Sequence, residues 1–87
     1  MTILTFNDDS LERGGVTREE AIEVLDDPMT VDDEEGESYQ GNPRVMYVGK
    51  TLSERLLEIG VEYKEYETHI YHGRKASLRM RAKYDNR

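Results

Sequence analysis

Apolar positions recur at helical spacing in one early segment of the chain. Residues 21–25 form this stripe, and they directly follow Thr17-Arg18-Glu19-Glu20. That tetrapeptide fits a capping box, in which the Thr17 hydroxyl accepts from the Glu20 amide and the Glu20 carboxylate accepts from the Thr17 amide. Pro28 disfavours helical geometry at the residue before it. The pattern predicts a helix over about residues 18–27.

Alternating apolar and polar positions predict three strands in the second half of the chain. They cover residues 44–48, 55–63 and 66–72, and the short links between them favour antiparallel hairpins. Because side chains two apart share one face of a sheet, Leu57, Ile59 and Val61 are expected on one face. Glu58, Gly60 and Glu62 are expected on the other.

The remaining segments give weaker signals. Residues 1–6 predict a short strand or an extended lead-in, and a single turn of helix fits around Leu11. Residues 30–42 lack periodicity and predict a solvated loop, and residues 75–85 predict a final helix. We therefore expect residues 1–87 to form one α+β domain with a small antiparallel sheet of three to four strands packed with two helices. The uncovered sheet face would be the working face.

The composition indicates a small core. Apolar residues make up 36% of the chain and charged residues also 36%, against usual values of about 45–50% and about 25%. Cysteine is absent, which excludes disulfides and thiolate metal sites. No signal peptide and no apolar run near the roughly 20 residues of a membrane helix is evident. These features predict a soluble cytoplasmic protein with no membrane partner.

The charge is divided unevenly along the chain, whose net charge is -7. Residues 1–40 carry thirteen Asp and Glu and two Arg (net -11), whereas residues 41–87 carry ten Lys and Arg and six Asp and Glu (net +4). The overall acidity argues against indiscriminate nucleic-acid binding, but the basic second half leaves room for a local phosphate-facing surface. Two ordinary solvated surfaces of opposite sign are the alternative.

One face of the last two predicted strands gathers groups that metal-independent RNA cleavage uses. The expected members are Glu58, Glu62, Glu67, His69 and Tyr71, with Arg44 joining from the strand before. In such cleavage a base removes the 2′-hydroxyl proton, an acid protonates the leaving 5′-oxygen, and cations stabilise the charged phosphorane. The alternative is an ordinary polar face of a solvated sheet.

His69 and His72 are candidates for a pair of metal ligands, but side chains three residues apart on a strand point to opposite faces. The acidic run at residues 32–37 lacks the ligand spacing of a calcium loop. We therefore expect no metal and no other cofactor.

Several cations stand at or after the predicted junction of the last strand and the last helix, where they can bind phosphates or pair with the acidic half of the chain. They are Arg74, Lys75, Arg79, Arg81 and Lys83.

Three segments of the chain resemble the BrnT family of toxins. Residues 15–28 are similar to its Gly-Val-x-x-x-Glu-Ala…Asp-Pro helix, and residues 44–49 with 55–61 to its Arg-Phe…Gly…Gly-Arg-x-Leu-x-Val-Val strands. Residues 70–76 are similar to its Ile-Ile-Ser-Ala-Arg-Lys-Ala, followed by a basic helix. The order and spacing match over about residues 15–84.

The resemblance implies a RelE-like fold and a ribonuclease toxin of a type II toxin–antitoxin pair, with RNA and a small DNA-binding antitoxin as partners. By matching position, Arg44, Arg55, Arg74 and Lys75 are carried over as RNA-binding or catalytic residues. The chain departs from the family in several places. Arg13-Gly14-Gly15 replaces Lys-His-Gly, Glu54 replaces the common Gly, and His69 and His72 stand where Arg and Ser are more common.

The first hypothesis is therefore a metal-independent endoribonuclease toxin that an antitoxin neutralises. His69 or Glu67 would be the base, His72 or Tyr71 the acid, and the cations would hold phosphates. Those cations are Arg44, Arg55, Arg74, Lys75, Arg79, Arg81 and Lys83. The alternative is a catalytically inactive protein-interaction module on the same fold, so whether the chain is an enzyme stays open at this point. The oligomeric state is also open, with a homo-oligomer as one alternative.

Overall fold

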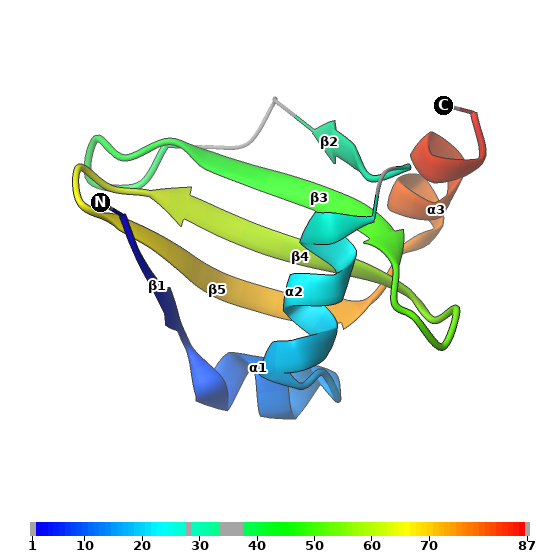
Figure 1. The fold of residues 1–87 in the computed structure, drawn as a ribbon. Helices are drawn as coiled ribbons and strands as arrows, with labels where there is room; N and C mark the ends of the chain where they lie inside the picture. Colours follow the sequence, from blue (N-terminus) through cyan, green and yellow to red (C-terminus); the bar gives the residue numbers. More distant parts are fainter. Residues whose placement is uncertain (1, 28, 34–37, 87) are drawn as a thin grey trace.

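A single mixed sheet organises the chain, in the strand order β1-β5-β4-β3-β2 (Figure 1). The computed structural model describes residues 2–27, 29–33 and 38–86. Within these residues the elements are β1 (Ile3–Phe6), α1 (Asp8–Gly14), α2 (Arg18–Asp26), β2 (Val31–Asp33), β3 (Arg44–Lys50), β4 (Leu56–Tyr63), β5 (Glu67–Lys75) and α3 (Leu78–Asp85). The expected α+β class is confirmed. The expected count of three to four strands and two helices is wrong, because the described residues form five strands and three helices.

The first strand explains part of this difference. β1 pairs in parallel with β5, from Ile3 opposite Glu67 to Phe6 opposite Ile70. The sheet is therefore mixed and not purely antiparallel. The chain then turns directly into α1, where the Asn7 side chain accepts a hydrogen bond from the Ser10 amide as N-cap.

The helix expected at residues 18–27 is confirmed as α2. The capping box is present: the Thr17 hydroxyl accepts from the Glu20 amide at 3.1 Å, and the Glu20 carboxylate accepts from the Thr17 amide at 3.0 Å. Helices α1 and α2 lie on the same side of the sheet (Figure 1). Their apolar side chains join those of β4 and β5 in a core that contains Leu11, Val16, Ala21, Val24, Leu57, Ile59, Val61 and Ile70.

The last helix packs elsewhere. Met80 and Tyr84 of α3 form a second buried cluster with Val48 of β3 and with Ala76. Residue 48 pairs with Glu58, so this cluster lies on the sheet face that carries the β4 carboxylates. The face opposite α1 and α2 is therefore not left uncovered, because α3 packs over one end of it.

Three element boundaries differ from the sequence-based expectations. β3 continues through Gly49 to Lys50, and residues 31–33 form β2 at the sheet edge, although they lie in the expected loop. The acidic run lies partly outside the described residues. β5 continues to Lys75, so α3 begins only at Leu78, after Ser77 as N-cap. No helix among the described residues is long and apolar enough to cross a membrane.

Candidate functional site

A β-bulge in β5 rearranges the side chains on the α3 face of the sheet. The β4–β5 register shifts between Gly60 and Val61, so that His72 pairs with Gly60 and Tyr71 becomes the extra residue. The expectation that His69 and His72 point to opposite faces is therefore wrong. The inserted residue brings both imidazoles to the face that also carries the carboxylates of β4.

Arg44 occupies the centre of an aromatic and acidic cluster on this face. Its Cζ lies 4.0 Å from the ring centroid of Tyr71 and 4.2 Å from that of Tyr39. Its Nη2 donates to Glu62 Oε1 at 3.2 Å, and Asn42 Nδ2 donates to Glu62 Oε2 at 3.1 Å. The Glu62 side chain is only 4% exposed. Arg44 therefore both neutralises a buried carboxylate and stacks between two rings.

Tyr71 is the extra residue of the bulge. Burial raises the pKa of Tyr71 above its ordinary value of 10.0. The charge of Arg44 opposes this rise, and the Glu62 and Glu58 carboxylates add to it. At neutral pH the phenol of Tyr71 is therefore protonated, so it can donate a proton or a hydrogen bond but cannot serve as a base.

His72 meets a second buried carboxylate. Its Nε2 lies 3.0 Å from Glu58 Oε2, and the Ser77 amide donates to Glu58 Oε1 at 2.8 Å. Burial raises the pKa of Glu58, but the hydrogen bonds from the Ser77 amide and from His72 outweigh it, so the net shift is downward. Glu58 is therefore an anion at neutral pH that orients His72 and also fixes the start of α3.

The other histidine belongs to a separate chain of hydrogen bonds at the β1–β5 edge. The Thr5 hydroxyl donates to the Glu67 carboxylate, and Thr5 Oγ1 lies 2.7 Å from His69 Nδ1. The Thr5 hydrogen bond is the main cause of the lowered pKa of Glu67, and burial opposes it. This group lies on the same sheet face as His72, three positions along β5 from it.

The predicted cations do not all gather at this face. Arg55 bonds to the Glu20 carboxylate and its Nη2 donates to Gly15 O at 3.3 Å, so it fastens the start of β4 to the start of α2. Arg74 and Lys75 are exposed strand residues at the end of β5. They lie at the expected junction of the last strand and the last helix, where the Ser77 amide that begins α3 is already bonded to Glu58. Arg79 and Arg81 are exposed on α3, and Lys83 is half-buried there.

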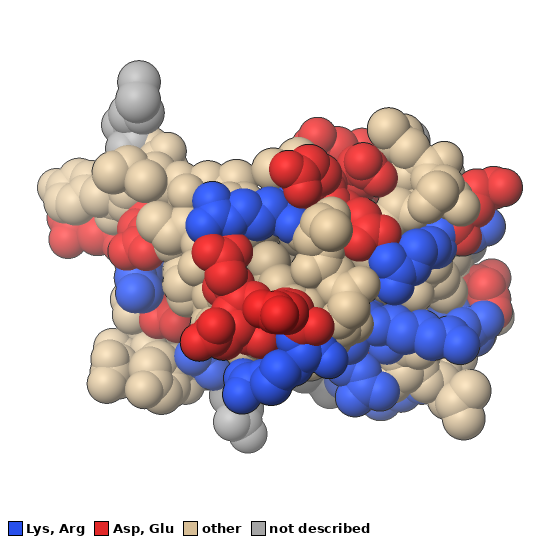
Figure 2. All heavy atoms as spheres, turned by 90° about the horizontal axis from the view of Figure 1, so that it is seen from below, with Lys and Arg blue, Asp and Glu red and all other residues tan. Residues whose placement is uncertain are grey.

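The surface charge is mixed and not uniformly basic. Figure 2 shows Asp and Glu gathered in patches, with Lys and Arg between and around them, on the side seen from below. Several Lys and Arg groups lie toward the end of the molecule that carries α3 in Figure 1. An RNA strand would therefore have to follow a restricted basic path.

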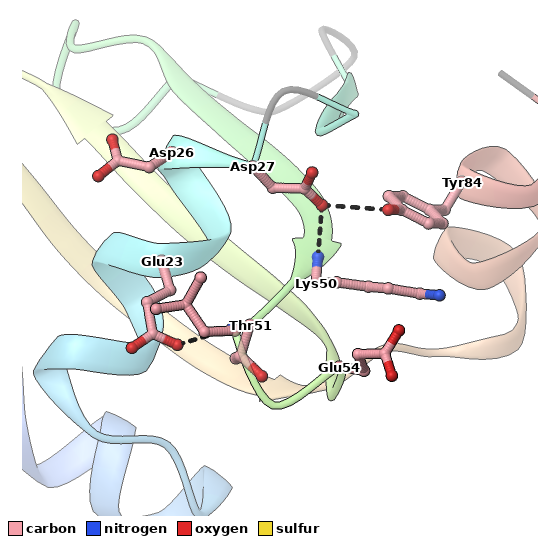
Figure 3. A pocket seen from close by; sticks show the side chains of 8 residues that line it. Glu23, Asp26, Asp27, Lys50, Thr51, Glu54 and Tyr84 are labelled. Atoms are coloured by element: carbon pink, nitrogen blue, oxygen red, sulfur yellow. Dashed lines mark hydrogen bonds between the residues drawn. The ribbon is translucent and has the colours of Figure 1, made fainter.

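An acidic pocket of about 390 Å³ lies between the end of α2, the β3–β4 loop and α3 (Figure 3). Its carboxylates hold this region together. Asp27 Oδ2 accepts from the Lys50 amide at 2.7 Å and from the Tyr84 hydroxyl at 3.1 Å. Glu23 Oε1 accepts from the Leu52 amide at 2.9 Å. These contacts give the acidic pocket a structural role.

Within the described part of the chain, no group of three or more His, Asp or Glu side chains is placed to hold a metal ion. Comparison with protein-family models gives no match. Comparison with curated proteins gives no significant match either. The function therefore has to be argued from the geometry of this face.

Some members of the face were not predicted from the sequence. Tyr39 reaches Arg44 because residues 39–42 form a tight turn with positive φ at Gln40 (50°) and Gly41 (83°). Gly41-Asn42-Pro43 is a turn signal in the sequence. Thr5 was missed because nothing local indicates that β1 pairs with β5.

Proposed function

We propose that this protein is a metal-independent endoribonuclease of the toxin class with a RelE-like fold. The observation that carries the proposal is the placement of His72, Tyr71 and Arg44 on one sheet face, supported from below by the carboxylates of Glu58 and Glu62. Such a face combines a proton carrier, a protonated phenol, a fixed cation and aromatic surface. Metal-free cleavage of an RNA phosphodiester needs these groups.

The positions of these side chains assign each of them a step in the proposed cleavage reaction. A base removes the 2′-hydroxyl proton, the 2′-oxygen bonds to phosphorus, and the bond to the 5′-oxygen breaks as an acid protonates that oxygen. The products are a 2′,3′-cyclic phosphate and a 5′-hydroxyl. His69, hydrogen-bonded through Thr5 to Glu67, is the proposed base, and His72 held by Glu58 is the proposed acid. Tyr71 is the alternative acid, because its raised pKa keeps it protonated.

The aromatic rings offer a surface on which a nucleobase of the RNA can stack. Unstacked RNA bases pack on aromatic side chains and on guanidinium planes. Tyr39 and Tyr71 flank Arg44 at 4.2 and 4.0 Å. The exposed cations at the end of β5 and on α3 would then follow the RNA backbone. These are Arg74, Lys75, Arg79 and Arg81.

The cellular role rests on the resemblance of the sequence to the BrnT family. That resemblance implies a protein antitoxin as partner and an RNA target in the cytoplasm. If the chain is such a toxin, its expression alone arrests growth, and coexpression of an antitoxin encoded beside it restores growth. Growth arrest that persists in a folded variant without RNA cleavage would contradict this role.

The test of the activity is cleavage of RNA by the purified protein with and without EDTA. We expect cleavage that resists the chelator and falls by a factor of about 100 or more in His72→Asn, which is the usual contribution of one acid–base group. Arg18→Gln is the matched control, because Arg18 pairs with Asp8 on the far side of the sheet. Cleavage that EDTA abolishes, or that His72→Asn leaves unchanged, would overturn the proposal.

A second candidate is a catalytically inactive interaction module on the same fold. The observation that favours it is that both buried carboxylates of β4 are already committed to holding the structure together, Glu62 to Arg44 and Glu58 to Ser77. A folded protein that neither cleaves RNA, with or without ribosomes, nor arrests growth would establish this reading over the first.

A further inference from the structure

A basic pocket lies where the end of α1 meets the part of β5 that extends beyond β1. It has a volume of about 330 Å³ and is lined by Ser10, Arg13, Gly14, His72, Gly73 and Arg74. The lining residues include two arginines and one histidine, and no Asp or Glu. The acidic pocket of Figure 3 has the opposite character.

Two glycines create this pocket. A Cβ at Gly14 would stand 1.7 Å from the carbonyl oxygen of Gly73, and a Cβ at Gly73 would stand 2.6 Å from Leu11 Cδ2. Only glycine therefore allows the backbones of α1 and β5 to approach so closely. This approach brings Arg13, which precedes one glycine, and Arg74, which follows the other, to the same pocket.

The pocket has no Asp or Glu among its lining residues, and the neighbouring Glu58, opposite Arg74 on β4, is bonded to His72 and Ser77. Other guanidinium groups have carboxylate partners: Arg18 pairs with Asp8, and Arg44 with Glu62. In contrast, the hydrogen-bond partners of the two pocket arginines within the described residues are neutral. Arg13 Nη2 donates to Ser10 Oγ at 3.2 Å. Arg74 Nε donates to the backbone carbonyl of Lys75 at 3.3 Å.

This imbalance is unexpected in an acidic chain. The protein has 19 Asp and Glu against 12 Lys and Arg, so carboxylates are abundant enough to pair with every arginine. Arg13 also suits the negative end of α1, but that effect fades within one helical turn and does not account for Arg74. Two guanidinium groups that have no carboxylate partner among the described residues, together with a serine hydroxyl, are a donor set that binds a phosphate group.

We propose that this pocket binds a phosphate group and that Arg13 is its main unrecognised binding residue. The inference rests on the proposed ribonuclease function for the source of the phosphate, which is the RNA backbone next to the cleaved bond. Arg13 and Arg74 hold the phosphate oxygens, and the Ser10 hydroxyl donates a further hydrogen bond. His72 also lines the pocket, although its Nε2 meets Glu58 on the sheet face opposite α1.

The pocket is tested by ligand titration without any cleavage. Inorganic phosphate and a dinucleotide with a methylated 2′-oxygen, which cannot be cleaved, are titrated at constant ionic strength. The amide NMR signals of Gly14 and Gly73 report occupancy. We expect saturable shifts with both ligands and a dissociation constant raised about tenfold in Arg13→Gln, because the variant loses one charge-assisted hydrogen bond at an exposed position.

A matched variant controls for charge alone. Arg18→Gln makes the same change at the Asp8 ion pair outside the pocket, and it should leave both affinities unchanged. Equal weakening in Arg13→Gln and Arg18→Gln would show a general charge effect and would overturn the site. Dinucleotide binding lost in Arg13→Gln supports it, whereas binding of inorganic phosphate alone overturns the assignment to RNA.

The two proposals fail separately. Phosphate and dinucleotide binding without RNA cleavage would support the pocket and overturn the ribonuclease. Chelator-resistant RNA cleavage with a Michaelis constant unchanged by Arg13→Gln would support the ribonuclease and overturn the pocket. A folded state of each variant is confirmed by its thermal unfolding, since Arg13 is exposed and its replacement leaves the core intact.

Discussion

Tyr71 lies against Gly60 so closely that a Cβ at position 60 would stand 2.7 Å from Tyr71 Cζ. The bulge in β5 turns the Tyr71 ring onto β4, and the glycine provides the space for it. The ring then forms one side of the stack on Arg44. The position of a candidate RNA-binding cation thus depends on a residue that has no side chain.

Gly60→Ala should therefore destabilise the protein and displace Tyr71. We expect the free energy of unfolding to fall by about 1–3 kcal/mol, the usual cost of overpacking. The double variant Gly60→Ala/Tyr71→Ala should be less destabilised than the sum of its two single variants, because the clash is then absent. Urea unfolding of the four proteins measures this, and strictly additive effects would contradict the contact.

Arg44→Ala should cost stability as well as any RNA binding. Its removal leaves the buried Glu62 carboxylate with the hydrogen bond from Asn42 but without its cation, and breaking such a pair costs about 3 kcal/mol or more. Arg44→Ala/Glu62→Gln should recover much of that loss, since no buried charge remains unpaired. Chemical denaturation checks the recovery, and a double variant as unstable as Arg44→Ala would show that the ion pair is not the cause.

Glu58 should make stability depend on pH in the acid range. The pKa of Glu58 is lowered in the folded protein from its ordinary 4.5, so the folded carboxylate binds a proton less readily than the unfolded one. Its contribution is present above pH 4.5 and is lost as the pH falls through the folded pKa. Glu58→Gln should flatten the loss of stability below pH 4.5 relative to the wild type. Denaturant unfolding from pH 7 to pH 3 measures it, and parallel curves would refute the assignment.

Glu54→Gly should stabilise the protein. Glu54 has φ of +67°, in the left-handed region that costs a side chain about 1–2 kcal/mol. Glycine removes that cost but adds unfolded-state entropy, so the expected net gain is about 0.5–1 kcal/mol. Glu54→Ala is the control, because it removes the same charge and keeps the unfavourable φ. The melting temperature decides between them, and an equal effect of both variants would mean that charge is responsible.

The sequence predicted the structure correctly where contacts between residues close in the chain determine it. Thr17 and Glu20 specify the capping box of α2 through contacts three residues apart, and it forms as predicted. The alternation in residues 55–63 also predicts the faces of β4 correctly, since Leu57 and Ile59 are buried under α1 and α2. The face that gathers Arg44 with the carboxylates of β4 follows from the same alternation.

The sequence did not predict the structure where the pairing of strands that are distant in the chain determines it. Residues 1–6 were predicted as a short strand or an extended lead-in, but their parallel pairing with residues 67–70 could not be foreseen. A three-residue edge strand such as β2 has too few positions to show alternation. The bulge at Tyr71 is set by the packing of its ring over Gly60, so an argument from alternation placed His72 on the wrong face. The start of α3 was misplaced because Ser77 is capped in part by a distant carboxylate.

The parallel pairing of β1 with β5 also sets the order in which the molecule can assemble. Thr5 and His69 are 64 residues apart in the chain, yet they share a hydrogen bond at the sheet edge. During synthesis β1 must therefore wait, with its backbone groups solvated, until β5 has left the ribosome. Such a long-range contact slows folding, so the proposed base His69 gains its hydrogen-bonding partner only in a nearly finished chain. A shorter nascent chain carries Thr5 but not yet His69, so this hydrogen bond is absent from it.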